Sequence, residues 1–172
     1  ISTRLIAVMV LLSALLAGVV LVAVLQMRAM RGSTQEIVDD WLPSVTVVGA
    51  LKAAIADLRA LESQHVLNTD EGAMDRIGKV MADKVKSIDT LRETYVKYVD
   101  SPEEKTLNNS LQTNWSKYLA QHQEIVDAST KRDKFPARKL LEGDAQATFD
   151  QLGAIVNQIT ELNERGAASA SA

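Results

Sequence analysis

Apolar side chains recur every three or four positions along four stretches of this 172-residue chain. The second stretch, for example, carries Met74, Ile77, Met81, Ile88 and Leu91. This spacing places the side chains on one face of an α-helix, and no segment alternates apolar and polar residues for long enough to predict a strand. Four such helices joined by short turns predict an all-α, up-down-up-down four-helix bundle.

Turn signals divide the predicted bundle, residues 27–166, into helices at about 27–68, 70–100, 102–131 and 136–166. The sequence "SPEE" at 101–104 is the clearest signal. Ser101 is a suitable N-cap, Pro102 suits the first helical position, and Glu104 completes a capping box. Thr69 or Asp70 can cap the preceding helix, and Pro136 is well placed to open the last one.

Composition excludes several classes of function. Hydrophobic residues make up 47% of the chain but aromatic residues only 4%, the net charge is −3 with both signs interleaved, and cysteine is absent. We therefore expect no nucleic-acid partner, no disulfide and no thiolate chemistry. The two histidines, His65 and His122, match no spaced metal or catalytic motif. Either could ligate a haem iron, but the aromatic residues to pack a macrocycle are scarce. We expect no enzyme, no metal and no cofactor.

The segment 5–26 predicts a transmembrane helix that continues into the bundle. The run "LIAVMVLLSALLAGVVLVAVL" at 5–25 has no charge and no proline, and its length matches a hydrocarbon core of about 30 Å. A cleavable signal peptide is the alternative, although its apolar core is usually about 7–15 residues and ends at a small-residue cleavage site. Flanking arginines determine the orientation only weakly. Because the chain opens on Ile1 and stops before a second apolar run, we expect a fragment, with 167–172 leading toward a second span.

Polar residues interrupt the apolar stripes at a similar depth in all four helices. Counting from the turns near Asp70 and Asp133 puts this layer about 16–23 Å from the tip, at about 1.5 Å per residue. The residues of this layer are Arg59, Lys84, Tyr118, His122 and Thr148. Unpaired polar groups are costly to bury, and two cations, a phenol and a hydroxyl would suit a small carboxylate. We expect the bundle to be apolar nearer the membrane and polar in this distal half.

Simpler interpretations remain open for each residue. Lys84 alone would more often lie at the edge of its stripe, and His122 alone would more often be a hydrogen-bonded core histidine. Glu62 can pair with Arg59 three residues earlier, and His65, next to a turn, is expected to be solvated. A second candidate site lies lower, where Arg92 is followed one turn later by Tyr95 and both could hold a carboxylate. Trp115 is expected only to pack the core.

Three stretches resemble the periplasmic four-helix-bundle sensor domains of bacterial methyl-accepting chemotaxis receptors. "ISTRLIAVMVLLSALLAGVVLVAVLQM" resembles their first span, "DDWLPSVTVVGALKAAIADLRALESQHVL" at 39–67 their first periplasmic helix, and "LNERGAASASA" the junction before their second span. The resemblance covers the whole chain, although the middle helices match by pattern more than by motif.

This resemblance implies a dimeric sensory module in the bacterial inner membrane, with its bundle in the periplasm. A bound amino acid or organic acid would shift the last helix and thereby control chemotaxis signalling. In aspartate-type relatives, arginines of the first helix contact the ligand, and Arg59 is the only such match here; Ala54, Glu62, Ser63 and Gln64 occupy the neighbouring positions. Aspartate itself is therefore in doubt. The alternatives are a ligand-free dimerisation scaffold, a docking domain for a periplasmic binding protein, or the sensor domain of a histidine kinase.

Overall fold

The computed structural model describes residues 8–9, 11–13, 15–26 and 42–170, and in these ranges it contains helices and no strand. Residues 8–9, 11–13 and 15–26 are helical. The remaining helices are α2 (Leu42–Leu67), α3 (Glu71–Val96), α4 (Pro102–Thr130), α5 (Lys134–Glu142) and α6 (Asp144–Ala170).

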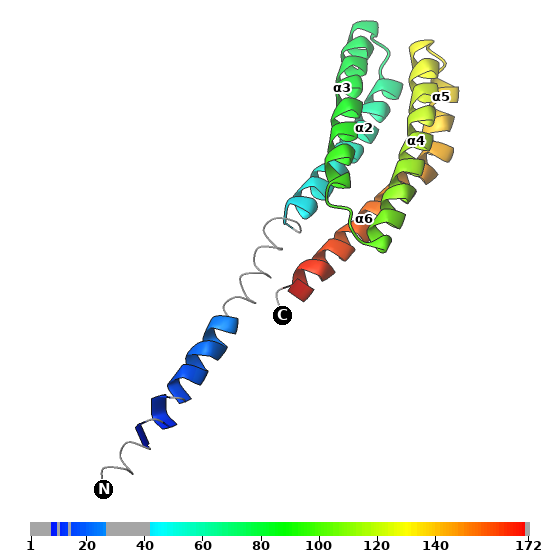
Figure 1. Cartoon of the computed structure of the whole chain (residues 1–172). Coiled ribbons are helices and arrows are strands. Elements are labelled where there is room, and N and C mark those ends of the chain that lie inside the picture. The colour runs from blue at the N-terminus through cyan, green and yellow to red at the C-terminus, as the bar shows by residue number, and fades with distance from the viewer. Residues whose placement is uncertain (1–7, 10, 14, 27–41, 171–172) are drawn as a thin grey trace.

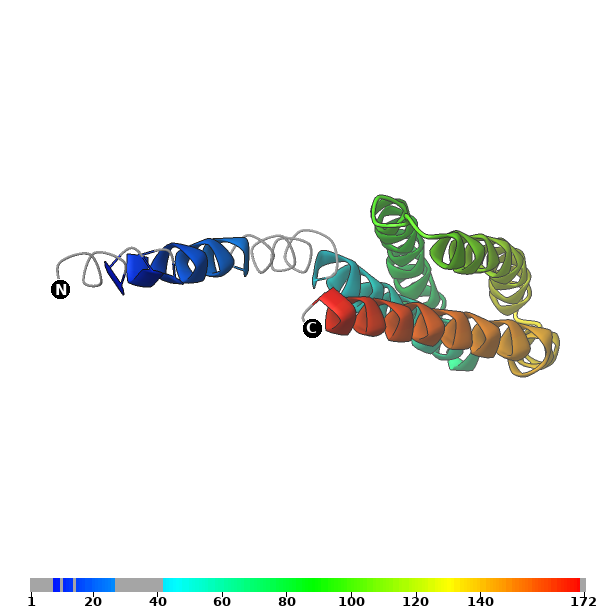
Figure 2. The same ribbon diagram turned by 60° about the horizontal axis from the view of Figure 1, so that its bottom comes forward.

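These helices form an up-down-up-down bundle, so the predicted all-α four-helix architecture is confirmed. Figures 1 and 2 show α2 and α4 running in one direction and α3 and the α5–α6 pair in the other. The start of α2, the α3–α4 turn and the end of α6 share one end of the bundle, which we call the basal end. The α2–α3 and α4–α5 turns form the distal end. The bundle therefore begins, at the start of α2, and finishes, at the end of α6, at the same end.

The predicted caps form at the two turns that carry them. At the start of α4, the Ser101 hydroxyl accepts from the Glu104 amide at 3.1 Å, while the Glu104 carboxylate accepts from the Ser101 amide at 2.8 Å. At the start of α3, the Asp70 carboxylate accepts from the Ala73 amide at 2.7 Å. Each cap satisfies amides that have no partner inside their own helix.

The last arm of the bundle is two helices, whereas the sequence predicted one helix over 136–166. The break falls at Gly143, where a Cβ atom would lie 2.8 Å from the Lys139 carbonyl oxygen, so only glycine fits without a shift of the backbone. The Gly143 carbonyl then accepts from the amides of Gln146 and Ala147 and starts α6. The break leaves the last carbonyls of α5 without helical partners.

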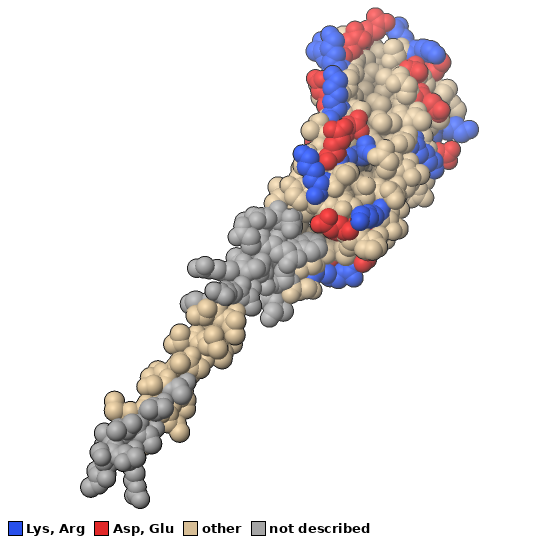
Figure 3. Space-filling model, in the orientation of Figure 1, with Lys and Arg blue, Asp and Glu red and all other residues tan. Residues whose placement is uncertain are grey.

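The core lies between α2, α3, α4 and α6 and consists mainly of aliphatic side chains, with Trp115, Tyr95 and Tyr118 as the largest members. Trp115 packs the core as expected, since only 1% of it is exposed, but it does not only pack, because its Nε1 atom also donates to Asp89 at 2.8 Å. Lys, Arg, Asp and Glu are interleaved over the face of the bundle that Figure 3 shows. A smaller apolar cluster at the distal end joins Val66, Ile125 and Leu141.

Among the residues that the structure describes, no helix combines the length and the apolar character needed to cross a bilayer. The large apolar side chains described between Val8 and Leu25 are exposed. The predicted span, residues 5–26, lies partly outside the described residues. The segment 27–41, through which the span was predicted to continue into α2, lies wholly outside them. Both therefore stay predictions.

Replacement of Ser101 by alanine removes the acceptor of the capping box, and we expect this to lower the free energy of unfolding by about 1 kcal/mol. For a chain of this size the midpoint of thermal unfolding should fall by about 3 °C. Circular dichroism of the full chain in detergent micelles measures both values. The matched control is Thr113→Ala in the same helix, whose exposed hydroxyl bonds only the Asn109 carbonyl. Equal stability of the two variants would contradict the role of the cap.

Candidate functional site

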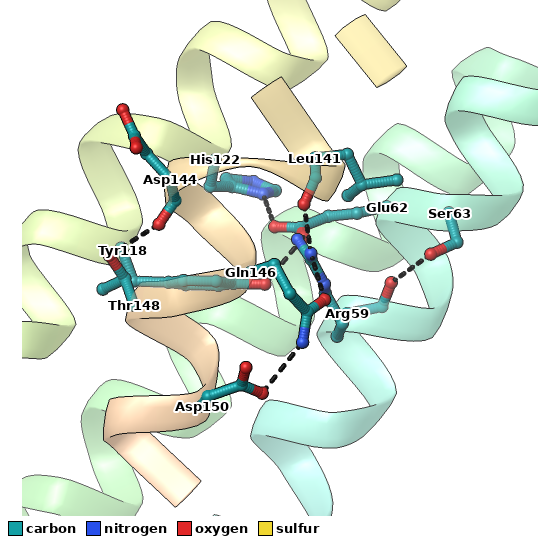
Figure 4. Close-up of polar contacts among 10 residues, drawn as sticks. All are labelled: Arg59, Glu62, Ser63, Tyr118, His122, Leu141, Asp144, Gln146, Thr148 and Asp150. Carbon is teal, nitrogen blue, oxygen red and sulfur yellow. Dashed lines mark hydrogen bonds and ion pairs between the residues drawn. The ribbon is translucent and has the colours of Figure 1, made fainter. Parts of the chain in front are cut away.

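The carboxylate of Glu62 lies at the centre of a buried polar cluster in the distal half of the bundle. It is fully buried and accepts three hydrogen bonds: from the Tyr118 hydroxyl at 2.6 Å, from an Arg59 guanidinium nitrogen at 3.2 Å and from His122 Nδ1 at 2.7 Å. Figure 4 shows these side chains converging from α2 and α4. The expected pairing of Glu62 with Arg59 is confirmed, and the apolar stripe of α2 does turn polar toward the interior at Glu62.

Arg59 connects α2 to both parts of the last arm. Its Nη2 atom donates to the Leu141 carbonyl in the last turn of α5 and, at 2.8 Å, to Gln146 Oε1 in α6. Leu141 can accept because the helix ends one residue later, and arginine commonly satisfies such carbonyls. The guanidinium also lies over the ring of Phe149, 5.6 Å from its centroid. One cation thus joins three helices (Figure 4).

A cavity of about 420 Å³ lies beside this cluster, between α2 and the α5–α6 break. Its lining residues are Arg59, Ser63, Val66, Leu67, Arg138, Leu141, Glu142 and Gln146. Arg138 is exposed and pairs with Glu142 at 2.7 Å. The cavity therefore presents two guanidinium groups, a hydroxyl and an amide beside an apolar wall, which is chemistry suited to a small anion with an apolar portion.

Tyr118 and Thr148 are buried in the predicted layer, as the sequence placed them. Burial, reinforced by the neighbouring Glu62 carboxylate, raises the pKa of the Tyr118 phenol, so the phenol stays protonated and donates to Glu62. The Thr148 hydroxyl instead donates to the Asp144 carbonyl of its own helix at 3.0 Å. Tyr118 thus belongs to the cluster, whereas the hydroxyl of Thr148 is used locally.

Lys84 was expected in this layer, and that expectation is wrong. Its ammonium group lies at the edge of α3 and donates to Asp57 on α2 at 3.0 Å, with 28% of the lysine side chain and 62% of the aspartate side chain exposed. A lysine at the edge of a stripe extends its charge to water more cheaply than it buries it.

The second predicted pair, Arg92 and Tyr95, is not brought together. Arg92 lines a groove of about 260 Å³ between α3 and α4, where it pairs with Asp89 at 2.7 Å and also donates to Gln112. Tyr95 is fully buried, and its hydroxyl has no hydrogen-bond partner. Burial, with a smaller effect of Glu104, raises the pKa of Tyr95 to about 12. Only the arginine faces the groove.

His65 was expected to be solvated, but only 3% of it is exposed. Its Nδ1 atom lies 2.9 Å from the Ser129 hydroxyl of α4, and that hydroxyl donates to the His65 carbonyl at 3.1 Å. Lys134 of α5 closes the group by donating to Ser129 Oγ at 2.9 Å. Burial and the positive charge of Lys134 lower the pKa of His65. The distal turns thus cover this histidine, although it lies only two residues from the end of α2.

The expectation of an apolar interior toward the basal end is also wrong. Asn163 of α6 is fully buried and donates through Nδ2 to the buried Ser44 hydroxyl of α2 at 2.8 Å, while its Oδ1 atom has no partner. Polar contacts therefore join α2 and α6 near the basal end as well as in the distal half.

Sequence reasoning missed the cavity residues Ser63, Arg138 and Gln146. The signal that could have found them is "EGD" at 142–144, a glycine followed by an N-cap type of residue, which marks a helix stop and restart. The Ser129 and Lys134 contacts of His65 carry no such local signal. Among the described residues, no group of three His, Asp or Glu side chains could hold a metal ion.

Replacement of Glu62 by alanine leaves Arg59, Tyr118 and His122 without their shared acceptor inside the bundle. We expect the free energy of unfolding to fall by about 3–5 kcal/mol, the usual range when one partner of a buried ion pair is removed. Urea denaturation measures the change. The control, Lys84→Ala, removes a partly exposed pair and should cost no more than about 1 kcal/mol. Similar losses for the two variants would show that the cluster does not organise the interior.

The lowered pKa of His65 makes stability depend on pH. Below about pH 6.5 the unfolded chain binds a proton at this histidine and the folded chain resists doing so, so the free energy of unfolding should fall as the pH falls below 6.5. Urea denaturation between pH 8 and pH 5 measures this slope. His65→Gln should flatten the slope, whereas the control His122→Gln removes only a smaller cause of the lowered pKa of His65 and should keep most of the slope, because burial and Lys134 remain. An unchanged slope in His65→Gln would contradict the assignment.

Comparison with known proteins agrees with this architecture. The whole chain, residues 1–172, matches the family model described as a four-helix-bundle sensory module for signal transduction. The chain is also similar to the Bacillus subtilis (strain 168) protein named "Putative sensory transducer protein YvaQ", with 25% identity over 162 residues, which cover 94% of this chain and 28% of that protein. The resemblance seen in the sequence is thereby confirmed, and the chain belongs to the family of four-helix-bundle sensory modules for signal transduction.

Proposed function

We propose that this sensory module recognises a small organic acid or amino acid through its carboxylate, at the cavity between α2 and the α5–α6 break. The observation that carries the proposal is the position of Arg59. This arginine lines the cavity and also holds together α2, α5 and α6 from inside the bundle. A ligand that binds Arg59 would therefore change the contacts of α6, the helix that runs to the basal end.

The cavity chemistry supports a carboxylate as the recognised group. A guanidinium presents paired N–H donors that match the two oxygens of a carboxylate, and Arg59 keeps its guanidinium oriented by fixed partners. Ser63 and Gln146 add a hydroxyl and an amide, while Val66 and Leu67 provide an apolar wall for the rest of the ligand. The predicted contacts from Tyr118 and His122 would act indirectly, because both donate to Glu62.

Membership of the family supports the cellular setting that we propose. The module would be anchored in the bacterial inner membrane by 5–26, with its bundle in the periplasm, and would act as a homodimer. Binding would displace α6 relative to α2, and the displacement would pass through the membrane to control chemotaxis signalling or a histidine kinase. The match covers 28% of the length of the Bacillus subtilis relative.

A ligand-free scaffold that mediates dimerisation or docks a binding protein is the second candidate. The observation in its favour is that Glu62 already supplies Arg59, Tyr118 and His122 with an acceptor, so the interior is satisfied without a ligand. The two candidates differ in one measurable property, which is direct binding of small acids.

Isothermal titration of the full chain in lipid nanodiscs against a panel of mono- and dicarboxylates and amino acids tests the proposal. We expect saturable binding of at least one acid, and Arg59→Ala should weaken it at least about tenfold, since a hydrogen bond to a charged group contributes about 1.5–3 kcal/mol.

The matched control is Arg92→Ala, which removes an arginine from the α3–α4 groove and should leave the affinity unchanged. The opposite pattern, in which only Arg92→Ala weakens binding, would place the ligand site in the α3–α4 groove. No heat with any acid would support the scaffold instead. Circular dichroism establishes that each variant is folded.

A further inference from the structure

From inside the bundle, the Glu62 carboxylate already accepts a hydrogen bond from the arginine that a carboxylate ligand in the cavity would bind. Its three donors are a guanidinium, a phenol and an imidazole, at 3.2, 2.6 and 2.7 Å. These are the groups that the sequence suggested for an external acid. The fully buried Glu62 would therefore compete with such a ligand for Arg59.

Only one member of this cluster reaches the cavity. Arg59 lines it, whereas Glu62, Tyr118 and His122 do not. The other arginine of the cavity, Arg138, is exposed and already paired with Glu142. An anion that enters the cavity thus meets Arg59 first, and it shares the single positive charge of that guanidinium with Glu62.

The net charge of the cluster determines what else must change when an anion binds. The positive charge of Arg59 balances the negative charge of Glu62, so the pair is neutral. An added carboxylate brings a second negative charge that shares the same guanidinium. A buried carboxylate without a compensating charge costs several kcal/mol, and such groups usually bind a proton instead.

We propose that a carboxylate ligand draws Arg59 away from Glu62 and that the Glu62–His122 pair takes up about one proton from solvent for each ligand bound. This inference rests on the proposed function. The proton is held between the Glu62 carboxylate and the His122 imidazole, which are 2.7 Å apart. The charges then balance again, with the ligand paired to Arg59 and the proton paired to Glu62.

The neighbouring charged groups already carry a proton, resist taking one up or are paired in solvent, so the Glu62–His122 pair is the proton acceptor. From α4, Tyr118 already carries its proton, because burial and Glu62 raise its pKa. From α2, His65 is close enough to interact with His122. Burial lowers the pKa of His65, and the positive charges of Lys134 in α5 and of His122 lower it further. Asp75 of α3 has a smaller, opposite effect on the same pKa. At the rim of the cavity, Arg138 and Glu142 pair with each other in solvent.

The same movement would loosen the α5–α6 break. Arg59 donates to the Leu141 carbonyl at the end of α5 and to Gln146 at the start of α6, so a ligand that takes the guanidinium also competes with these contacts. Ligand binding, proton uptake and release of α6 from α2 would then be one coupled event, with external acid favouring the bound state.

Isothermal titration of the full chain in nanodiscs tests the coupling, with acetate, succinate, citrate, benzoate and aspartate as probes. At pH 7.5 each titration is run in phosphate and in Tris, whose ionisation enthalpies differ, so the difference in measured heat gives the number of protons taken up. We expect about one proton per ligand, and a Kd that falls up to tenfold for each unit of pH below 8.

Glu62→Gln keeps the size of the side chain but removes its charge. It should reduce the proton uptake to near zero and lower the Kd at pH 7.5 at least tenfold, because Arg59 is no longer held by a carboxylate. The matched control Glu142→Gln makes the same change at the rim of the cavity and should keep the proton uptake of the wild type.

The possible results separate the two proposals. Binding by the wild type without proton uptake would overturn the coupling and leave carboxylate sensing intact; this comparison needs no variant to fold. Proton uptake that persists in Glu62→Gln or disappears in Glu142→Gln would also overturn it. No binding of any probe between pH 6 and pH 8 would overturn both the coupling and the proposed function.

Discussion

The buried carboxylate of Glu62 determines how the distal half of the bundle is assembled. A charge removed from water must be met by donors in fixed positions, and here α2 and α4 supply them. Arg59, which balances this charge, also bonds the end of α5 and the start of α6. The relative positions of four helices thus depend on one acid and its arginine, and an apolar core residue could not specify them as narrowly.

Two further polar contacts act on either side of this cluster. The His65–Ser129–Lys134 group joins α2, α4 and α5 near the distal turns, and Ser44–Asn163 joins α2 and α6 near the basal end. All of them involve α2. Between them the core is mainly aliphatic, and aliphatic surfaces tolerate small sliding movements better than hydrogen bonds with fixed partners do. Polar contacts that can exchange partners would give such a bundle two discrete arrangements, which a sensory module requires.

The helix break at Gly143 makes the site possible. A continuous fourth helix would have used the Leu141 carbonyl internally, whereas the end of α5 leaves it free to accept from Arg59. The break also forms one wall of the cavity. The break at Gly143 thus links the surface cavity to the buried cluster and to α6.

The sequence by itself determined the helical class, the number and order of the arms, the SPEE capping box and the pairing of Glu62 with Arg59, because periodicity, caps and contacts three residues apart are local properties. Only the tertiary structure decided which polar residues of different helices meet. Lys84 and His122 hold equivalent places in their stripes, yet one reaches water and the other the interior. Burial depends on which neighbouring helices cover a position, and that is a property of the packed bundle rather than of any one segment.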